Sequence, residues 1–405
     1  MLSVHEALER VLAHARPLAQ ATIPLGELLG RTLAEDIASD IDSPPYNKSM
    51  VDGYAVRASD LANGRAELEV IEEIMAGAVS TRPIAPGTCS RIMTGAPIPE
   101  AADAVVMQEQ TERLASGPTR VRINDERFRA GQNILPRGVA MRQGDVVLRS
   151  GRPIRPAEIA LLAEVGRAEV LAIPAPRVAV LSTGNELVSA ADRPTAGQIR
   201  NSNGPMLVAA VEQAGALPVN LGIARDEPDE LRERLVTGLK QNILVISGGV
   251  STGVLDLVPG LLAELGVRQV FHRIRMKPGK PLWFGASSNT LVFGLPGNPV
   301  SSFVCFELFV KPAIARLARR EAQTKHRLSN AQLAGDFTHR GDRPTYQPAV
   351  MGADGSEAPR AVKPLSWAGS ADLRGLVDAN ALIVFPAGDR TYSAGETVEV
   401  LRLDD

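Results

Sequence analysis

Four apolar runs of strand length recur between residues 177 and 297, and each ends in a glycine-rich or polar turn. They are RVAVLS, PVNLGIA, NILVIS and TLVFGLPG. Stretches with helical periodicity separate or follow them, among them NGPMLVAAVEQAGA, PDELRERLVTGL and LVPGLLAELG. Short buried runs that alternate with helices are typical of strands wound into one sheet with helices on both faces. We therefore predict a doubly wound α/β domain over residues 171–325.

The remaining chain predicts three further regions. At 405 residues the chain is too long for one ordinary domain. The runs YQPAVM, ALIVFPAG and TVEVLRL, separated by turn residues, predict a C-terminal small β-barrel or sandwich over 326–405. Short strand patterns cut by glycine and proline, beginning with a strand at about 54–56, predict an inserted β-rich domain over 41–136.

Residues 1–40 and 137–170 are predicted to form one elongated helical and strand domain around that insertion. Apolar residues at helical spacing predict helices at 3–15 and 25–36. A third helix is predicted at 156–166, where Pro156 stands at the start, Glu158 in the first turn and Gly166 at the end.

The charge balance and cysteine content exclude several classes of protein. Lys+Arg 44 against Asp+Glu 46 and 4% aromatic residues give no basis for nucleic-acid binding or attraction to a membrane surface. Cys89 and Cys305 have no zinc-ligand spacing, and the five histidines show none. We expect a cytoplasmic protein, since there are few cysteines, no signal-peptide pattern and no apolar run of membrane-spanning length.

Two strand-end loops carry glycines beside hydroxyl groups. Ligands of doubly wound sheets bind outside the carboxyl ends of the strands. The loops at 182–187 and 247–256 can therefore cradle a phosphate, although a tight strand-to-helix turn is the alternative interpretation. The predicted ligand-binding residues in them are Ser182, Thr183, Gly184, Ser247, Gly248, Gly249 and Ser251.

Three carboxylates occupy the same loops. Glu186, Asp226 and Asp256 are candidates to hold Mg²⁺ against a phosphate, because this ion prefers a few carboxylates together with substrate oxygens and water. Helix capping is the alternative role for Asp226 and Asp256, and a solvated loop acid is the alternative for Glu186.

Two further loops add positive charge and hydrogen-bond donors. Lys277 and Lys280 flank a Pro-Gly turn in the loop 275–285, where clustered ammonium groups favour an anion, although surface lysines are often merely solvated. The turn 294–302 enters a helix and offers Pro296, Gly297, Asn298 and Ser301. Together the loops predict a site for a phosphorylated, anionic small molecule, without covalent catalysis or zinc.

Six motifs in register resemble the molybdopterin molybdenumtransferase family, of the MoeA and gephyrin E-domain type. The resemblance covers nearly the whole chain. It rests on PPYNKSMVDGYAVR (44–57), RIMTGAPIPEAADAVVMQEQTE (91–112), LSTGNEL (181–187), SGGVSTGVLD (247–256), KPGKP (277–281) and LPGNPVSS (295–302).

The resemblance implies an enzyme that inserts molybdenum from molybdate into adenylylated molybdopterin. It implies release of AMP, Mg²⁺ dependence, an elongated homodimer and a molybdopterin-adenylylating protein as upstream partner. By position it also implies that Asp52 and Thr94 contribute to a dimer-interface cleft. Glu186, Asp226 and Asp256 match the ligand-domain carboxylates; Lys277, Lys280 and Ser301 match a molybdate site, which Ser370 approaches.

Two positions depart from the family pattern. Ala140 stands where the family often has an aspartate, and Pro348 where it usually has an arginine; Arg343 is our candidate for the missing cation. These departures keep open a catalytically weakened molybdopterin-binding carrier or scaffold as the alternative function. Adenylylation of molybdopterin itself is disfavoured, since related adenylyltransferases are typically a lone α/β domain.

Overall fold

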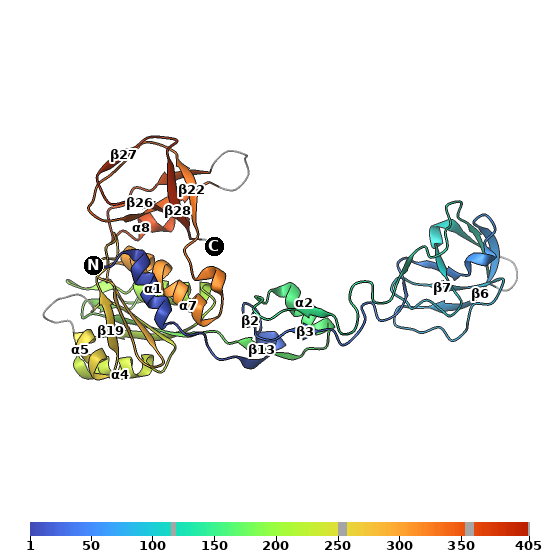
Figure 1. Cartoon of the computed structure of the whole chain (residues 1–405), viewed down its shortest axis with the longest axis horizontal. Coiled ribbons are helices and arrows are strands. Elements are labelled where there is room, and N and C mark those ends of the chain that lie inside the picture. The colour runs from blue at the N-terminus through green and yellow to red at the C-terminus, as the bar shows by residue number, and fades with distance from the viewer. Residues whose placement is uncertain (115–118, 250–256, 353–359, 404–405) are drawn as a thin grey trace. The chain divides into compact units, whose positions relative to one another are not determined.

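The structure is a computed structural model that describes residues 1–114, 119–249, 257–352 and 360–403. The chain forms two compact units (Figure 1). The first contains Met1–Ile23, Glu27–Ala34 and Leu171–Asp405, and the second contains Pro24–Gly26 and Glu35–Val170. Among the helices of the described residues, none is both long enough and apolar enough to cross a membrane.

A six-stranded sheet in the order β17-β14-β18-β21-β20-β19 forms the centre of the first unit. Its strands are β14 (Arg177–Thr183), β17 (Leu217–Ala224), β18 (Ile243–Ser247), β19 (Arg268–His272), β20 (Trp283–Ala286) and β21 (Leu291–Leu295). β14 runs parallel to β17 and β18, and β18 runs parallel to β21. β20 runs antiparallel to both of its neighbours. The α/β prediction is confirmed, with one antiparallel strand inside the sheet.

The sequence analysis treats residues 275–285 as a loop, but strand β20 begins inside this range, at Trp283. Trp283 and Phe284 are buried there, and the Phe284 ring lies 4.9 Å from the Phe293 ring of β21, centroid to centroid. Burial of an aromatic pair stabilises this pairing. The apolar run is too short to reveal the strand without its neighbour.

Helices cover both faces of the sheet. One core holds α1 (Val4–His14), α3 (Asn203–Gln213), α6 (Pro299–Cys305) and α7 (Lys311–Leu317), with a π-helical segment, Phe306–Val310, between the last two. The other core holds α4 (Pro228–Gly238) and α5 (Leu257–Glu264). In β14, Val178 and Val180 face the first core while Ala179 and Leu181 face the second, as strand alternation requires.

Helix α1 packs in the first core, together with Phe284. The sequence analysis instead groups residues 1–40 with residues 137–170. The bounds of α1 agree with the predicted helix 3–15. Ser3 and Glu6 form a capping box at its start, and Ala7 and Val11 are fully buried. An apolar stripe predicts that a helix is covered on one face, but it does not identify the covering surface.

The predicted helix at 25–36 is wrong. A 3₁₀ turn, Leu25–Glu27, is followed by the short strand β2 (Thr32–Leu33), which pairs with β13 (Glu169–Ile173) in the sheet β1-β13-β2, where β1 is Ala21–Pro24. Gly30 adopts φ +74°, a left-handed conformation that ends helical continuity. Tertiary pairing with β13 outweighs the weak helical periodicity here.

The C-terminal part of the first unit is a closed barrel in the order β22-β25-β24-β26-β28, which confirms the barrel prediction. Its strands are β22 (Leu328–Leu333), β24 (Thr345–Met351), β25 (Ala361–Pro364), β26 (Ala381–Phe385) and β28 (Thr397–Arg402), joined by the pair β23 (Phe337–His339) and β27 (Arg390–Tyr392) and by helix α8 (Arg374–Val377). Tyr346, Leu382 and Leu401 pack in the core shared with the sheet. The barrel is therefore continuous with the α/β part.

The second unit is mainly β-structure. Its largest sheet has the order β8-β5-β7-β6-β10-β9, with β5 (Gly53–Val56), β6 (Arg65–Ile74), β7 (Thr88–Ile92), β8 (Ala104–Met107), β9 (Thr111–Leu114) and β10 (Arg120–Asn124). Two short pairs, β4 (Lys48–Ser49) with β11 (Ile134–Leu135) and β3 (Ile37–Ala38) with β12 (Val146–Leu148), and helix α2 (Pro156–Glu164) complete it. Strand β5 and helix α2 agree with the strand and helix predicted at 54–56 and 156–166.

Glu158 in the first turn of α2 generates a prediction about acid stability. It is 3% exposed, and its carboxylate pairs with Arg155 at 2.9 Å and Arg152 at 2.8 Å. Hydrogen bonding from Arg155 lowers the pKa of Glu158 to about 2 from its ordinary 4.5. A depressed folded-state pKa stabilises the protein fully above the unfolded value, and this contribution is lost as pH falls from 4.5 towards 2.

We therefore expect Glu158→Gln to lower stability at pH 7 and to make the loss of stability between pH 5 and pH 3 shallower. Urea unfolding across this range measures both effects. Exposed Glu169, changed to Gln, is the matched control. If the free energy of unfolding of Glu158→Gln fell as steeply between pH 5 and pH 3 as that of the unaltered protein, the prediction would be contradicted.

Candidate functional site

The loops predicted to bind a ligand leave one edge of the sheet. β14, β17, β18 and β21 run parallel, so their ends at Thr183, Ala224, Ser247 and Leu295 lie at the same edge. The Gly184 amide donates to the Ala224 carbonyl at 3.2 Å, and the Gly248 amide donates to the Leu295 carbonyl at 3.2 Å. We call this edge, with the loops that follow these strands, the carboxyl edge.

Glycines at the carboxyl edge permit close backbone approach. Gly248 has φ +89°, and a Cβ there would lie 2.5 Å from the Thr183 carbonyl oxygen. Gly249 has φ +63°, and its Cβ would lie 2.6 Å from Thr183 Oγ1. A side chain at either position is therefore both strained and obstructed. The glycines serve the packing of the two loops as well as any ligand.

Asn203, which the sequence analysis did not single out, links two of the loops. Its Nδ2 donates to Ser247 Oγ at 2.7 Å and to the Gly297 carbonyl at 2.7 Å. Ser182 Oγ donates to Asn201 Oδ1 at 3.1 Å in the same buried region. The signal in the sequence is NSNG at 201–204, polar residues where a buried helix begins. Only the fold explains why they are buried.

Two buried oxygen atoms at this edge have no partner among the described residues. They are Thr183 Oγ1 and Asn203 Oδ1. Buried polar atoms are costly to leave unsatisfied, so each calls for a ligand group, a water or a neighbouring loop atom. This feature fits the predicted role of the loop after β14.

The predicted carboxylates are only partly described. The Asp226 amide donates to Asn185 Oδ1 at 3.2 Å, which brings the loop after β17 to the loop after β14 that also carries Glu186. Glu227, rather than Asp226, occupies the N-cap position of α4. Asp256 and Ser251 lie outside the described residues. Among the described residues no group of three potential metal ligands occurs, and the three-carboxylate set stays a prediction.

The loop 275–285, which carries Lys277 and Lys280 and which we call the lysine loop, is held in place by the strand β24 region and by helix α6. The Lys277 amide donates to the Pro344 carbonyl at 2.9 Å, and the Lys277 carbonyl accepts from the Tyr346 amide at 2.8 Å. A Cβ on Gly279 would lie 2.7 Å from the Cys305 sulfur of α6, so the turn lies closely against that helix. Both lysine side chains are exposed and form no ion pair within the described part of the chain. The loop therefore presents two exposed cations, and the Asp342 carboxylate lies near enough to Lys280 for this lysine to help lower the pKa of Asp342.

Residues of the barrel part reach the lysine loop and the turn before α6. Arg343 Nη1 donates to the Met276 carbonyl at 3.3 Å, directly before Lys277, and Arg343 Nε pairs with the neighbouring Asp342 at 3.2 Å. Ser370 Oγ accepts from Asn298 Nδ2 at 2.8 Å, and the Ser370 carbonyl accepts from the Val300 amide at 3.1 Å. Ser301 is buried in the first turn of α6. The structure thus brings Arg343 beside the lysines, and Ser370 beside the predicted turn 294–302.

Asp52 and Thr94, in the second unit, contact each other. Asp52 Oδ1 accepts from both the Thr94 amide and the Thr94 hydroxyl at 2.7 Å. These hydrogen bonds lower the pKa of the Asp52 carboxyl group. Asp52 is half-buried directly before β5, and Thr94 is exposed in the segment that follows β7. Asp52 is therefore held as an anion in a fixed orientation.

The two departures from the family pattern occupy different surroundings. Pro348 is buried in β24 opposite Leu382, within the barrel wall. Ala140 is exposed in the second unit, and its amide donates to the Ser43 carbonyl at 3.0 Å. Because Pro348 occupies the position in β24, the strand carries no cation there. Arg343, in the turn before this strand, supplies a cation near Lys277.

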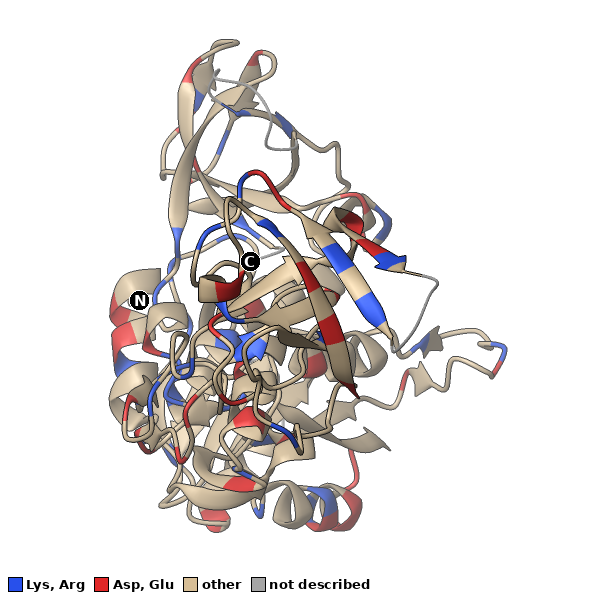
Figure 2. Ribbon diagram, turned by 90° about the vertical axis from the view of Figure 1, so that its right-hand side faces the viewer, with Lys and Arg blue, Asp and Glu red and all other residues tan. Residues whose placement is uncertain are grey.

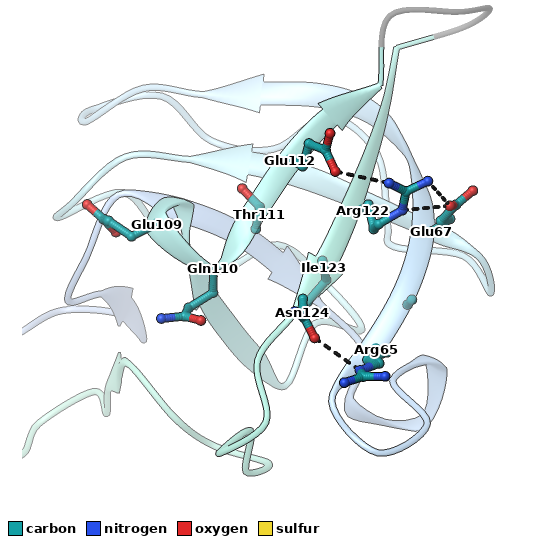
Figure 3. Close-up of a pocket in the computed structure, with 10 residues that line it drawn as sticks. Arg65, Glu67, Glu109, Gln110, Thr111, Glu112, Arg122, Ile123 and Asn124 are labelled. Carbon is teal, nitrogen blue, oxygen red and sulfur yellow. Dashed lines mark hydrogen bonds and ion pairs between the residues drawn. The ribbon is translucent and has the colours of Figure 1, made fainter.

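A pocket of ≈ 760 Å³ lies in the second unit, on β6, β9 and β10 (Figure 3). Its charges are largely compensated, because Arg122 pairs with Glu67 at 2.9 Å and with Glu112 at 3.0 Å, as the dashed lines in the figure show. Basic and acidic residues are likewise interspersed over the ribbon in Figure 2. Arg122 in this pocket is thus paired with two carboxylates, whereas Lys277 and Lys280 form no ion pair with another described residue.

The fold defines a multidomain protein with a doubly wound α/β part, whose carboxyl edge gathers loops that are predicted to bind an anionic ligand. The chain belongs to the MoeA family. Its residues 2–166 match the MoeA N-terminal region (domain I and II), residues 179–316 match a probable molybdopterin binding domain, and residues 330–403 match the MoeA C-terminal region (domain IV). The matches follow one another along nearly the entire chain.

Relatives support the same assignment. The chain is 37% identical to the molybdopterin molybdenumtransferase of Bacillus subtilis (strain 168), over 99% of this chain and 94% of that protein. It is 36% identical to the molybdopterin molybdenumtransferase of Staphylococcus aureus (strain N315), over 99% and 95%. The crystal structure of the molybdopterin biosynthesis MoeA protein from Pyrococcus horikoshii OT3 matches with a TM-score of 0.76 at 30% identity, covering 99% of this chain and 100% of that one.

The glycine contacts generate a prediction that separates backbone strain from steric obstruction. Gly248 and Gly222 both have positive φ, so alanine is strained at either position. Only at Gly248 would the added Cβ also meet another atom, because nothing lies within 4 Å of a Cβ at Gly222, so Gly248→Ala should destabilise the protein more than Gly222→Ala. Left-handed backbone alone costs about 1–2 kcal/mol. Urea unfolding of both variants gives the difference, and equal losses of stability would rule out the obstruction at Thr183.

Proposed function

We propose that this chain inserts molybdenum from molybdate into adenylylated molybdopterin and releases AMP. The observation that carries the proposal is the fixed lysine loop: Lys277 and Lys280 are exposed and form no ion pair within the described residues, and Arg343, which pairs with Asp342 at 3.2 Å, lies beside them. The family match over the α/β part and the names of full-length relatives support the same reaction.

Electrostatics is the main task of the lysine loop in this reaction. Molybdate is a dianion, and its substrate partner carries phosphate groups. Two like unit charges 4 Å apart repel by about 4 kcal/mol at an effective dielectric constant near 20. Lys277, Lys280 and Arg343 offset this repulsion and hold the oxyanion, while the glycine loops at Gly184 and Gly248 allow the phosphate part to approach the backbone.

Mg²⁺ dependence is part of the proposal. Glu186 and Asp226 provide carboxylate oxygens on two loops joined by the Asp226–Asn185 hydrogen bond, and such oxygens are the donors that Mg²⁺ prefers. Asp256 would be the third carboxylate. The bound ion would neutralise phosphate charge; the protein residues orient the two substrates so that the dithiolene sulfurs of the pterin meet the metal.

A homodimer, which the resemblance to the family implies, is also part of the proposal, with Asp52 and Thr94 as the residues that would contribute to a cleft at the dimer interface. In this arrangement the second unit of one subunit completes the cleft of another, with the Asp52 carboxylate oriented by Thr94. The protein that adenylylates molybdopterin is the proposed upstream partner, and the cytoplasm stays the predicted location. The carrier or scaffold alternative is not favoured, since the relatives are named as transferases.

Turnover with purified components tests the proposal. The full chain, molybdate, adenylylated molybdopterin and Mg²⁺ should release AMP and yield cofactor that activates an apo-molybdoenzyme. Omitting Mg²⁺ should abolish AMP release. Stoichiometric pterin binding without AMP release in the complete mixture would instead support the carrier alternative.

Lysine variants test the site itself. We expect Lys277→Ala and Lys280→Ala each to lower the rate of AMP release about tenfold to a hundredfold, since a hydrogen bond to a charged group contributes about 1.5–3 kcal/mol. Thermal unfolding should change little because both side chains are exposed. Lys240→Ala, also exposed and on the same unit, is the control. Full activity in both loop variants would remove the lysine loop from the mechanism.

A further inference from the structure

A second cavity lies at the opposite, amino edge of the same sheet. Its volume is ≈ 940 Å³. Asn242 directly precedes β18, Arg268 begins β19 and Leu291 begins β21, so the parallel strands start here and end at the carboxyl edge. Its other side is closed by the last two residues of α1, Ala13 and His14, by the residues 16–19 after that helix, and by Leu317 at the end of α7. We call it the amino-edge cavity.

The charged residues that line the amino-edge cavity are of one sign. Arg16 and Arg268 line it, and its described lining contains no aspartate or glutamate. Both arginines are exposed, and neither forms an ion pair with another described residue. This contrasts with the pocket in Figure 3, where Glu67 and Glu112 compensate Arg122. Uncompensated guanidinium groups around a cavity favour an anionic ligand.

The partial negative charges at the carboxyl ends of nearby helices oppose the positive charge of Arg16 and Arg268 but do not cancel it. The carboxyl ends of α1, α5 and α7 lie at the same edge, and each carries at most about half a negative charge, on its unsatisfied carbonyls. Several of these carbonyls are already satisfied: Leu317 accepts from the Leu18 amide at 2.9 Å, and Leu262 accepts from the Val267 amide at 2.9 Å. Two whole positive charges therefore outweigh the remaining partial charges.

The volume of the amino-edge cavity and its uncharged lining residues indicate a ligand larger than a simple oxyanion. A volume of ≈ 940 Å³ is at the upper end for small-molecule sites, which span about 300–1,000 Å³, and far exceeds one phosphate group. Pro17, Leu18 and Leu317 provide apolar surface, and Ser288 and Asn289 provide exposed hydrogen-bonding groups in the turn between β20 and β21. Such a lining suits a ring next to a charged group.

We propose that the amino-edge cavity binds a phosphorylated small molecule of nucleoside-monophosphate size. Arg16 and Arg268 contact its phosphate, and Pro17, Leu18 and Leu317 lie against its ring. The site is separate from the carboxyl edge, because it lies at the other ends of β18 and β21. It does not depend on the proposed transfer reaction, so its binding is measurable without turnover.

Calorimetric titration of the full chain with AMP, adenosine and inorganic phosphate tests the proposal. AMP should bind, and adenosine should bind at least about tenfold more weakly, because it lacks the group that the arginines contact. Inorganic phosphate should also bind more weakly than AMP, since it leaves the apolar surface uncovered. Adenosine binding as tight as that of AMP would overturn the role of the arginines.

Arginine variants locate the binding. Arg16→Ser with Arg268→Ser should remove one AMP site or weaken it at least about tenfold, whereas the same site should persist in Lys277→Ala with Lys280→Ala. Arg10→Ser, an exposed change on α1 outside the cavity lining, is the matched control. AMP titrations that are identical for the unaltered chain and the Arg16/Arg268 double variant would overturn the proposal.

Photolabelling of the unaltered chain keeps the test independent of variant folding. After irradiation with 8-azido-AMP, labelled peptides should include residues 13–19 or 286–291, and excess AMP should suppress the labelling. Arg16→Lys with Arg268→Lys, which keeps both charges, should retain it. Labels confined to the loops of the carboxyl edge would also overturn the proposal.

Discussion

Parallel pairing of β14, β17, β18 and β21 is the constraint on which the candidate site depends. Because these strands share one direction, the loops that follow them leave the sheet at one edge, and two backbone hydrogen bonds join the loops there. The sheet has a buried core on each face, so its position is rigid relative to the helices. Loops carried by such a frame hold their polar groups in fixed orientations.

The carboxyl edge combines features that are individually unfavourable. Gly248 and Gly249 adopt left-handed backbone conformations, and Thr183 Oγ1 and Asn203 Oδ1 are buried without a partner among the described residues. The loop between the end of β19 and the start of antiparallel β20 reaches the same edge, and it presents the like charges of Lys277 and Lys280 from one short turn. Costs of this kind are typical of functional sites, where a ligand supplies the missing hydrogen bonds and the opposite charge. The barrel supports the turn, since Pro344 and Tyr346 hold the backbone of Lys277.

Charge compensation distinguishes the cavities of this protein. In the pocket of the second unit, arginine and glutamate side chains neutralise one another and leave little attraction for an ion. At the amino edge of the sheet, Arg16 and Arg268 have no acidic counterpart in the lining. The net charge of −2 says nothing about either, because opposite charges elsewhere in the chain cancel in the sum. Local arrangement, and not composition, decides which surface attracts an anion.

The sequence by itself determined the parallel strands β14, β17, β18 and β21, the helices that follow the first three of them, the barrel at the C-terminus and the loops that carry Lys277, Lys280, Gly184 and Gly248. It could do so because strand and helix periodicities are local, and glycine, proline and charge clusters mark turns directly. Only the tertiary structure decided the rest. It turned residues 25–36 into a turn and a strand, added β20 to the sheet, packed α1 beside Phe284, and made Asn203 a buried link between Ser247 and Gly297. These outcomes depend on partners distant in the chain, and no local pattern encodes which distant surface buries a given side chain.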